Sequence, residues 1–165
     1  MTLVEGSIRI GVPDNCQSQR FDGSSHRMSH CMKAVDFLID TPAARIFLEI
    51  KDPDAADAPQ TSLDYAEKLV HGQLDADLYY KYRDSWLYLY AAGRRKRVPH
   101  YYFILLGLTT FTTESLAQRS MALQSKVCLE GPEGPWRNRF VDQVFVFNLA
   151  SWNRSFPEFP AERIS

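Results

Sequence analysis

The chain has 165 residues, of which 45% are hydrophobic and 13% aromatic, a composition typical of globular proteins that excludes an intrinsically disordered chain. Its length predicts a single domain spanning residues 1–165, with residues 151–165 as a C-terminal tail. The formal net charge of −1 gives no overall attraction to nucleic acid, so such binding would need a local basic patch.

Cysteine usage and hydropathy predict where the protein resides. The three cysteines, Cys16, Cys31 and Cys128, are odd in number and show no CxxC spacing, which favours a reducing compartment over a disulfide framework. The first residues lack a basic region followed by an apolar run, and no apolar run reaches the ~18 residues of a membrane span. We therefore expect a soluble, cytoplasmic protein without a membrane partner.

The N-terminal part of the chain is predicted to begin with a strand over residues 7–12, where apolar residues alternate up to Pro13. Residues 14–31 are polar and suit a loop with room for a short helix. His26 and His30 lie four residues apart with two cysteines nearby, a spacing that would suit zinc on a helix face. A polar loop is the favoured interpretation, because no paired cysteine motif supports zinc.

A β-hairpin is predicted at the centre of the chain, within residues 33–54. Apolar residues alternate with other residues on both sides of Thr41–Ala44, and this segment suits a four-residue turn with proline at its second position. If these four residues form the loop, the numbers of paired residues sum to 85. One face then holds only apolar pairs: Val35–Ile50, Phe37–Leu48 and Ile39–Ile46. The other face holds Ala34–Lys51, Asp36–Glu49, Leu38–Phe47 and Asp40–Arg45.

This register brings two acidic side chains together. Asp36 lies opposite Glu49, and like charges about 5 Å apart across a strand pair are destabilising. The pair needs a compensating cation, which a divalent metal would supply, with Lys51 close by. Asp40 is expected to pair with Arg45 at the turn.

After the hairpin, the loop at Asp52 and Asp54 is interpreted as solvated, with a second metal contact as the alternative. Thr61 or Ser62 is predicted to cap a helix through residues 65–70, with Gly72 weakening its middle. A long helix follows over Leu74–Ala92 and stops at Gly93. Its packing stripe is Leu74, Leu78, Tyr82, Trp86 and Leu89.

Arg94, Arg95, Lys96 and Arg97 form the only dense basic run in the sequence. They are candidates for contacts with nucleic-acid phosphates, and they also complement the negative end of the preceding helix. Both roles are compatible.

The C-terminal half is predicted to alternate strands with one helix. His100–Leu108 is a continuous apolar run that suits a central strand covered on both faces. Thr112 or Thr113 caps a helix of about residues 114–129, and residues 142–149 form a last, edge strand. Packing residues of this helix are Leu116, Met121, Leu123 and Val127, and Trp152, Phe156 and Phe159 are expected to fix the tail to the body.

The hairpin set Asp36…Glu49-x-Lys51 resembles the PD-(D/E)XK nuclease superfamily, in which a strand-borne Asp and a Glu-x-Lys on the next antiparallel strand bind Mg²⁺ and cleave phosphodiesters. Val35 stands where the family name has proline. The resemblance implies an α/β fold with a mixed central sheet flanked by helices, the restriction-endonuclease-like αβββαβ core. It implies Mg²⁺ or Mn²⁺ bound by Asp36, Glu49 and the Ile50 main-chain carbonyl, with Lys51 as the third catalytic residue.

The family also implies auxiliary positions. Asp22 is the better candidate for an upstream acid, since no Glu lies between Gly6 and Asp36. His30, six residues before Asp36, is a second auxiliary candidate. Lys81 is the candidate for a polar side chain offered by the long helix, with an i, i+3 ion pair to Asp84 as the slightly favoured alternative.

Three functional hypotheses follow. The first is a metal-dependent nuclease acting on nucleic acid, most simply DNA, and a homodimer would be the usual arrangement for cutting both strands. The second is a non-catalytic nucleic-acid- or protein-binding module on the same fold, favoured by the near-neutral charge. The third is a structural reading in which Glu49 and Lys51 form a solvated strand face.

Overall fold

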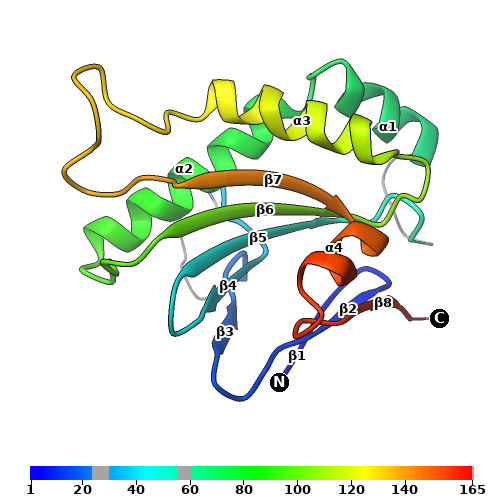
Figure 1. Ribbon diagram of the computed structural model, residues 1–165, viewed down its shortest axis with the longest axis horizontal. Helices are drawn as coiled ribbons and strands as arrows, with labels where there is room; N and C mark the ends of the chain where they lie inside the picture. The colour runs from blue at the N-terminus through cyan, green and yellow to red at the C-terminus, as the bar shows by residue number, and fades with distance from the viewer. Residues whose placement is uncertain (24–29, 56–60, 165) are drawn as a thin grey trace.

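The computed structural model describes residues 1–23, 30–55 and 61–164 (Figure 1). Two sheets and the helices between their strands form the fold. The elements in chain order are β1 (Thr2–Glu5), β2 (Ile8–Gly11), β3 (Gln17–Arg20), β4 (Phe37–Asp40), β5 (Arg45–Lys51), α1 (Ser62–Val70), α2 (Asp75–Ala91), β6 (His100–Leu106), α3 (Thr113–Lys126), β7 (Gln143–Asn148), α4 (Leu149–Ser155) and β8 (Ala161–Arg163).

The large sheet has the order β3-β4-β5-β6-β7 and mixes both strand directions. β3, β4 and β5 form an antiparallel meander, whereas β6 pairs parallel with β5 and β7 parallel with β6. The connection between β5 and β6 contains helices α1 and α2, and the connection between β6 and β7 contains α3, since parallel strands need such a crossover. The predicted mixed α/β architecture is confirmed, with β6 as the buried central strand and β7 at an edge.

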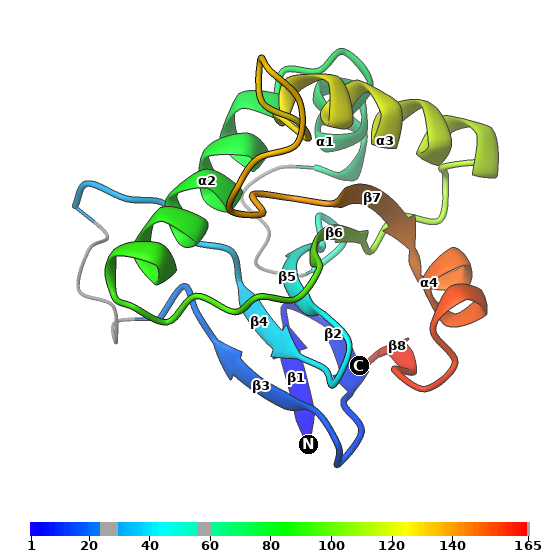
Figure 2. The ribbon, with the colours of Figure 1, turned by 60° about the vertical axis from the view of Figure 1, so that its left-hand side comes forward.

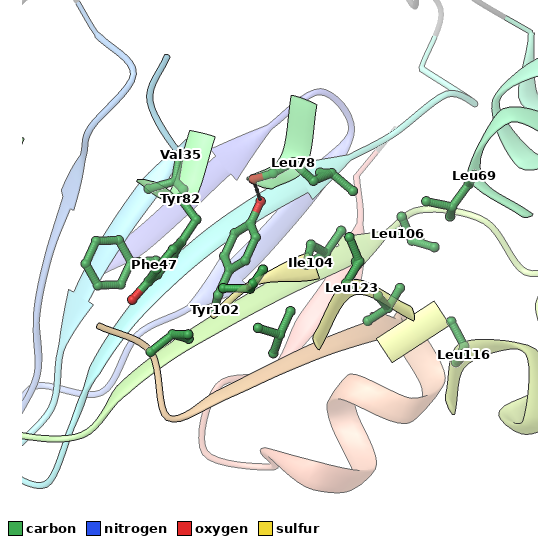
Figure 3. Close-up of a cluster of buried hydrophobic side chains, with 14 of the residues drawn as sticks. Val35, Phe47, Leu69, Leu78, Tyr82, Tyr102, Ile104, Leu106, Leu116 and Leu123 are labelled. Atoms are coloured by element: carbon green, nitrogen blue, oxygen red, sulfur yellow. Dashed lines mark hydrogen bonds between the residues drawn. The ribbon is translucent and has the colours of Figure 1, made fainter. Parts of the chain in front are cut away.

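The two faces of the large sheet are covered by different layers (Figures 1 and 2). α1, α2 and α3 pack on one face, where Phe47, Tyr102 and Ile104 of the sheet meet Tyr82 and Leu123 of the helices (Figure 3). The other face carries α4 and the small antiparallel sheet β1-β2-β8. Among the described residues, no helix combines the length and hydrophobicity needed to cross a bilayer.

The predicted hairpin register is confirmed over the length of β4. The pairs of β4 with β5 run from Phe37–Leu48 to Asp40–Arg45, and the two residue numbers of each pair sum to 85. Val35 departs from the prediction: it packs on the helical side beside Phe47 and Tyr82 rather than opposite Ile50 (Figure 3). Its N–H donates to the Ser85 hydroxyl on α2 (2.9 Å), so the chain leaves the ladder before β4 begins.

The helices differ from the prediction in two details. Gly72 does not lie within a helix; it adopts φ +70° between α1 and α2, a conformation that suits glycine. The caps are as expected, because the Thr61 and Thr112 side chains accept bonds from the backbone N–H groups of Asp64 and Ser115. Met121 is exposed rather than packed, while Leu116, Leu123 and Val127 are buried.

The sequence patterns missed several short elements. Within residues 14–31, the described part forms the polar edge strand β3 and no helix; residues 24–29 lie outside the described ranges. β1 and β8 were also not predicted, and the tail forms α4 as well as β8. Two side chains of this tail, Trp152 and Phe159, are buried against the large sheet and fix the tail to it, as expected.

Asp52 ties the small sheet to the end of β5, and its neighbours do not suggest a second metal. Its Oδ2 accepts the Ser7 N–H (2.9 Å) and hydroxyl (2.5 Å), and its Oδ1 lies 2.8 Å from Arg163 Nη2. The Arg163 guanidinium also donates to the Gly107 carbonyl (2.7 Å). This buried carboxylate therefore joins both ends of the chain to the large sheet.

We expect Asp52→Ala to lower the free energy of unfolding by about 2–3 kcal/mol, because it removes a buried carboxylate that accepts from Ser7 and pairs with Arg163. Urea denaturation followed by circular dichroism measures this loss. Asp54→Ala is the matched control, since Asp54 is an exposed carboxylate in the same loop, and it should change stability by less than about 0.5 kcal/mol. Equal losses in the two variants would contradict the assignment.

Candidate active site

Asp36 and Glu49 meet where β4 begins and β5 approaches its end. Asp36 immediately precedes β4, and its Oδ2 accepts the backbone N–H of Ile50 (2.7 Å). This carboxylate takes the acceptor role that a β4 carbonyl would fill if the ladder continued. The side chain is thereby fixed at the opening between the two strands.

The Ile50 carbonyl of β5 faces the same opening between β4 and β5. The Lys51 carbonyl accepts from Gly107 N–H (2.7 Å) on the β6 side, whereas Ile50 N–H points to the β4 side. Backbone groups of successive strand residues alternate between the two edges, and both groups of one residue share an edge. The Ile50 carbonyl therefore faces the β4 side, where Asp36 lies.

Two ammonium groups converge on Glu49, whose side chain is completely buried. Lys51 Nζ and Lys81 Nζ each lie 2.5 Å from Glu49 Oε1. Lys81 Nζ also lies 3.4 Å from Asp36 Oδ1, so it bridges the two carboxylates. Glu49 shares the helical face of the sheet with Phe47, which explains why a lysine of α2 reaches it.

The favoured expectation for Lys81, an ion pair with Asp84, is wrong. Asp84 instead accepts from the guanidinium of Arg83 (2.8 and 2.9 Å) and from the N–H of Lys33 (3.0 Å). Lys81 turns towards the sheet because the two buried carboxylates there need a counter-charge more than Asp84 does. The structure thus brings Asp36, Glu49, Lys51 and Lys81 together.

The electrostatics of the cluster follow from its burial. Burial and the neighbouring Asp36 raise the pKa of Glu49 to about 7, although the two lysines oppose the rise. Burial tends to lower the pKa of Lys51, but the Glu49 and Asp36 carboxylates outweigh it and hold that pKa above its usual value. Glu49 is therefore a carboxyl that titrates near neutrality while Lys51 stays charged.

Tyr65 on α1 is a residue of this region that the sequence patterns did not single out. Its hydroxyl is buried, and burial together with the Glu49 charge raises its pKa. Glu49 Oε2 and Tyr65 Oη both lack a hydrogen-bond partner among the described residues. Buried polar atoms are rarely left unpaired, so these two oxygens mark a place suited to a further polar partner.

The available donors are hard oxygens. Two carboxylates and the Ile50 carbonyl suit Mg²⁺ or Mn²⁺, which favour oxygen ligands, and the unpaired Glu49 Oε2 is of this kind. In the described ranges, no group of three Asp, Glu, His or Cys side chains is placed to hold a metal. A metal here would therefore use Asp36, Glu49 and backbone, as the sequence predicts.

The structure does not bring the other auxiliary candidates into this cluster. Asp22 Oδ1 pairs with Arg20 (3.2 Å) at the end of β3. His30 is exposed in a turn, and Cys31 beside it is exposed as well. His26 lies outside the described residues, so the alternative zinc site rests on the sequence alone.

The turn of the hairpin holds the ion pair that the register predicts. Arg45 Nε and Nη2 donate to the two oxygens of Asp40 (2.7 and 3.0 Å), a bidentate arrangement. Lys96 of the basic run lies 3.0 Å from Asp40 Oδ2. Asp40 and Lys96 thus serve the structure of the turn.

The remaining basic residues follow the C-terminus of α2. The Arg94 carbonyl accepts from Arg45 Nη1 (2.8 Å), and the Arg94 guanidinium donates to Gln19 (3.2 Å) from an exposed position. Arg95 donates to Asn138 and lies over the Tyr90 ring, and Arg97 is exposed. Arg94 and Arg97 are accordingly the better placed of the four for phosphate contacts.

Comparison of the chain with protein-family models, with curated proteins and with solved structures gives no match. The chemistry of the site therefore has to be argued from its own geometry.

We expect stability to depend on pH through Glu49. Its pKa is raised from 4.5 to about 7 by folding, so the folded state holds the proton more tightly than the unfolded chain. Stability should then fall as pH rises through this window, by up to about 3 kcal/mol, and this slope should be absent in Glu49→Gln. Urea denaturation at pH 5, 6, 7 and 8 measures this change in the free energy of unfolding, and Glu158→Gln, at an exposed position, is the control. Equal pH slopes in wild type and Glu49→Gln would refute the assignment to Glu49.

Proposed function

We propose that this protein is a Mg²⁺- or Mn²⁺-dependent nuclease that hydrolyses phosphodiester bonds, most simply in DNA, through Asp36, Glu49 and Lys51. One observation carries the proposal: two buried carboxylates and a lysine converge where β4 and β5 separate, and Glu49 Oε2 has no hydrogen-bond partner there in the described part of the chain. A purely structural role would favour apolar residues at such a position, because burying two like charges is costly.

The order of elements supports a restriction-endonuclease-like core. The β3-β4-β5 meander, followed by helices α1 and α2 and by parallel strand β6, supplies the βββαβ part of the predicted αβββαβ arrangement, with α1 as an additional helix. In the described segments before β3, strands β1 and β2 stand in place of the leading helix. The proposed catalytic residues lie on the meander, at the end of β5 that faces α2.

Each residue of the site has a role that its contacts define. Asp36, Glu49 and the Ile50 carbonyl would hold the divalent cation, and Asp36 is oriented for this by its bond from Ile50 N–H. When bound, such a cation polarises the scissile phosphate and lowers the pKa of an attacking water. Lys51, charged and partly exposed, is placed to stabilise negative charge that develops on phosphoryl oxygens. Lys81 holds the two carboxylates in one orientation.

A non-catalytic binding module is the second candidate, and Lys81 is the observation that favours it. Its ammonium bridges Asp36 and Glu49 and so supplies the counter-charge that a metal would otherwise supply. A protein in which a lysine takes the place of the metal ion would keep the fold and bind ligands elsewhere on its surface. The two candidates differ in whether divalent cations bind the cluster.

We expect the wild type to cleave plasmid, single-stranded DNA or RNA when Mg²⁺ or Mn²⁺ is added. Asp36→Ala and Lys51→Ala should each lower the rate by about 100-fold or more, since they remove a metal ligand and a charge-stabilising group. Gel electrophoresis of time courses measures the rate.

The control for this assay is Arg154→Ala, an exposed residue of α4 on the other face of the sheet, which should cut like wild type. Thermal melting of every variant separates loss of chemistry from loss of folding. Equal cleavage by wild type, Asp36→Ala and Lys51→Ala, or no cleavage under any condition, would overturn the nuclease proposal.

Lys81 gives a test that does not rely on activity. In Lys81→Met the ammonium no longer competes for the carboxylates, so Mg²⁺ should bind about tenfold more tightly than in wild type. Without metal, the variant should be less stable by about 1–3 kcal/mol, because Lys51 alone then balances the buried pair. Thermal shift against Mg²⁺ concentration reports both quantities, with Arg154→Met at an exposed position of α4 as control. No Mg²⁺ effect in either wild type or Lys81→Met would favour the binding module.

A further inference from the structure

The outward side of α2 is apolar and aromatic where a solvent-facing helix is usually polar. At helical spacing, Tyr80, Arg83, Leu87 and Tyr90 form this stripe, and the exposed fractions of its three uncharged members are 40%, 48% and 45%. The opposite side packs on the large sheet (Figure 2). A helix that is apolar on both sides is expected to have a partner on each.

Aromatic rings on this helix are interleaved with guanidinium groups. The Trp86 and Tyr90 rings are stacked, with centroids 5.1 Å apart and planes 14° apart. Arg95 lies 5.7 Å from the centroid of Tyr90, and Arg83 lies 4.5 Å from that of Tyr80. Aromatic and guanidinium planes are the two kinds of surface on which nucleobases stack.

The charge of the region matches a polyanion. Between Lys81 and Arg97 the sequence has six basic residues, of which Lys81, Arg83 and Lys96 are paired with carboxylates. The other three, Arg94, Arg95 and Arg97, have no carboxylate partner among the described residues. The neighbouring loop adds exposed Arg137 and Arg139, and it is held against α2 because Trp86 Nε1 donates to the Arg139 carbonyl (3.0 Å). A chain with a net charge of −1 thus concentrates positive charge around these rings.

We propose that this aromatic–arginine surface, formed by Tyr80, Arg83, Trp86, Tyr90, Arg94 and Arg97, binds single-stranded nucleic acid. Stacking requires base faces that are accessible, and in a duplex these faces are covered by neighbouring bases. The surface therefore selects unpaired strands over duplex. This inference rests on the proposed nuclease function in one respect only, that the bound strand continues to Lys81.

The helix sets the distance to the candidate active site. Tyr90 and Lys81 are separated by nine residues, or about 14 Å along the axis at about 1.5 Å per residue. That span equals about four nucleotides at the spacing of a stacked strand, about 3.4 Å. Tyr80, next to Lys81, lies at the near end of this path.

The test uses the full chain in EDTA, so that cleavage plays no part. Fluorescence anisotropy with a labelled deoxythymidine strand of about 20 nucleotides, longer than one typical single-strand site, is compared with a duplex of the same length. The wild type should bind the single strand at least about tenfold more tightly than the duplex, and Tyr90→Ala should lose about tenfold in affinity for it. Tyr90→Phe should retain binding, because stacking does not need the hydroxyl.

Matched controls separate the surface from general charge effects. Arg94→Gln with Arg97→Gln should weaken binding and reduce its salt dependence, whereas exposed Arg154→Gln on α4, across the sheet, should change neither. Equal affinity for single strand and duplex, or equal binding by wild type and Tyr90→Ala, would overturn the proposal. So would a wild type that sediments as a dimer and becomes monomeric in Leu87→Ala, which would show that a second copy covers this side. Binding in EDTA without cleavage in Mg²⁺ would leave the surface in place and reject the nuclease.

Discussion

Two carboxylates buried side by side constrain the rest of this structure. Asp36 and Glu49 lie together in the interior, where each ionised group costs several kcal/mol to desolvate and the pair repels itself. Two ammonium groups and one backbone N–H balance them, and these come from different elements: Lys51 from β5, Lys81 from α2 and the N–H of Ile50. α2 must therefore lie across the end of β5, and the packing of its other residues follows from that position.

At the opening between β4 and β5, side chains accept from backbone N–H groups that the ladder no longer pairs. The Ile50 N–H, which would face a β4 carbonyl, donates to the Asp36 carboxylate, and the Val35 N–H donates to Ser85 of α2. Side chains thus take over the ladder where the strands part, which satisfies the rule that buried peptide groups find partners. A polar site can then sit at the end of a sheet whose two faces are otherwise apolar.

Local patterns in the sequence predict the hairpin well because its information is local. The turn at Thr41–Ala44 determines the register, and alternation assigns the faces, so the approach of Asp36 to Glu49 could be foreseen. Alternation cannot show where a ladder stops, so it predicts the wrong face of the sheet for Val35. The partner of Lys81 is set by the need for charge in the core, and helical spacing to Asp84 carries no information about it. The burial of the Tyr65 hydroxyl depends on tertiary packing that local patterns do not show, and polar β3 has no alternation to detect.

The charge balance of the cluster has a consequence for the proposed chemistry. With Glu49 ionised, two carboxylates and two ammonium groups sum to zero, so a divalent cation entering alone would leave an excess of positive charge in a buried place. In the proposed function, nucleic-acid phosphates would supply the missing negative charge. In a nuclease built on these residues, metal and nucleic acid should therefore bind more tightly together than separately, and protonation of Glu49 should oppose the metal because it removes a ligand charge. In such a nuclease, the lysines that balance the two carboxylates would make the site depend on its substrate for full assembly.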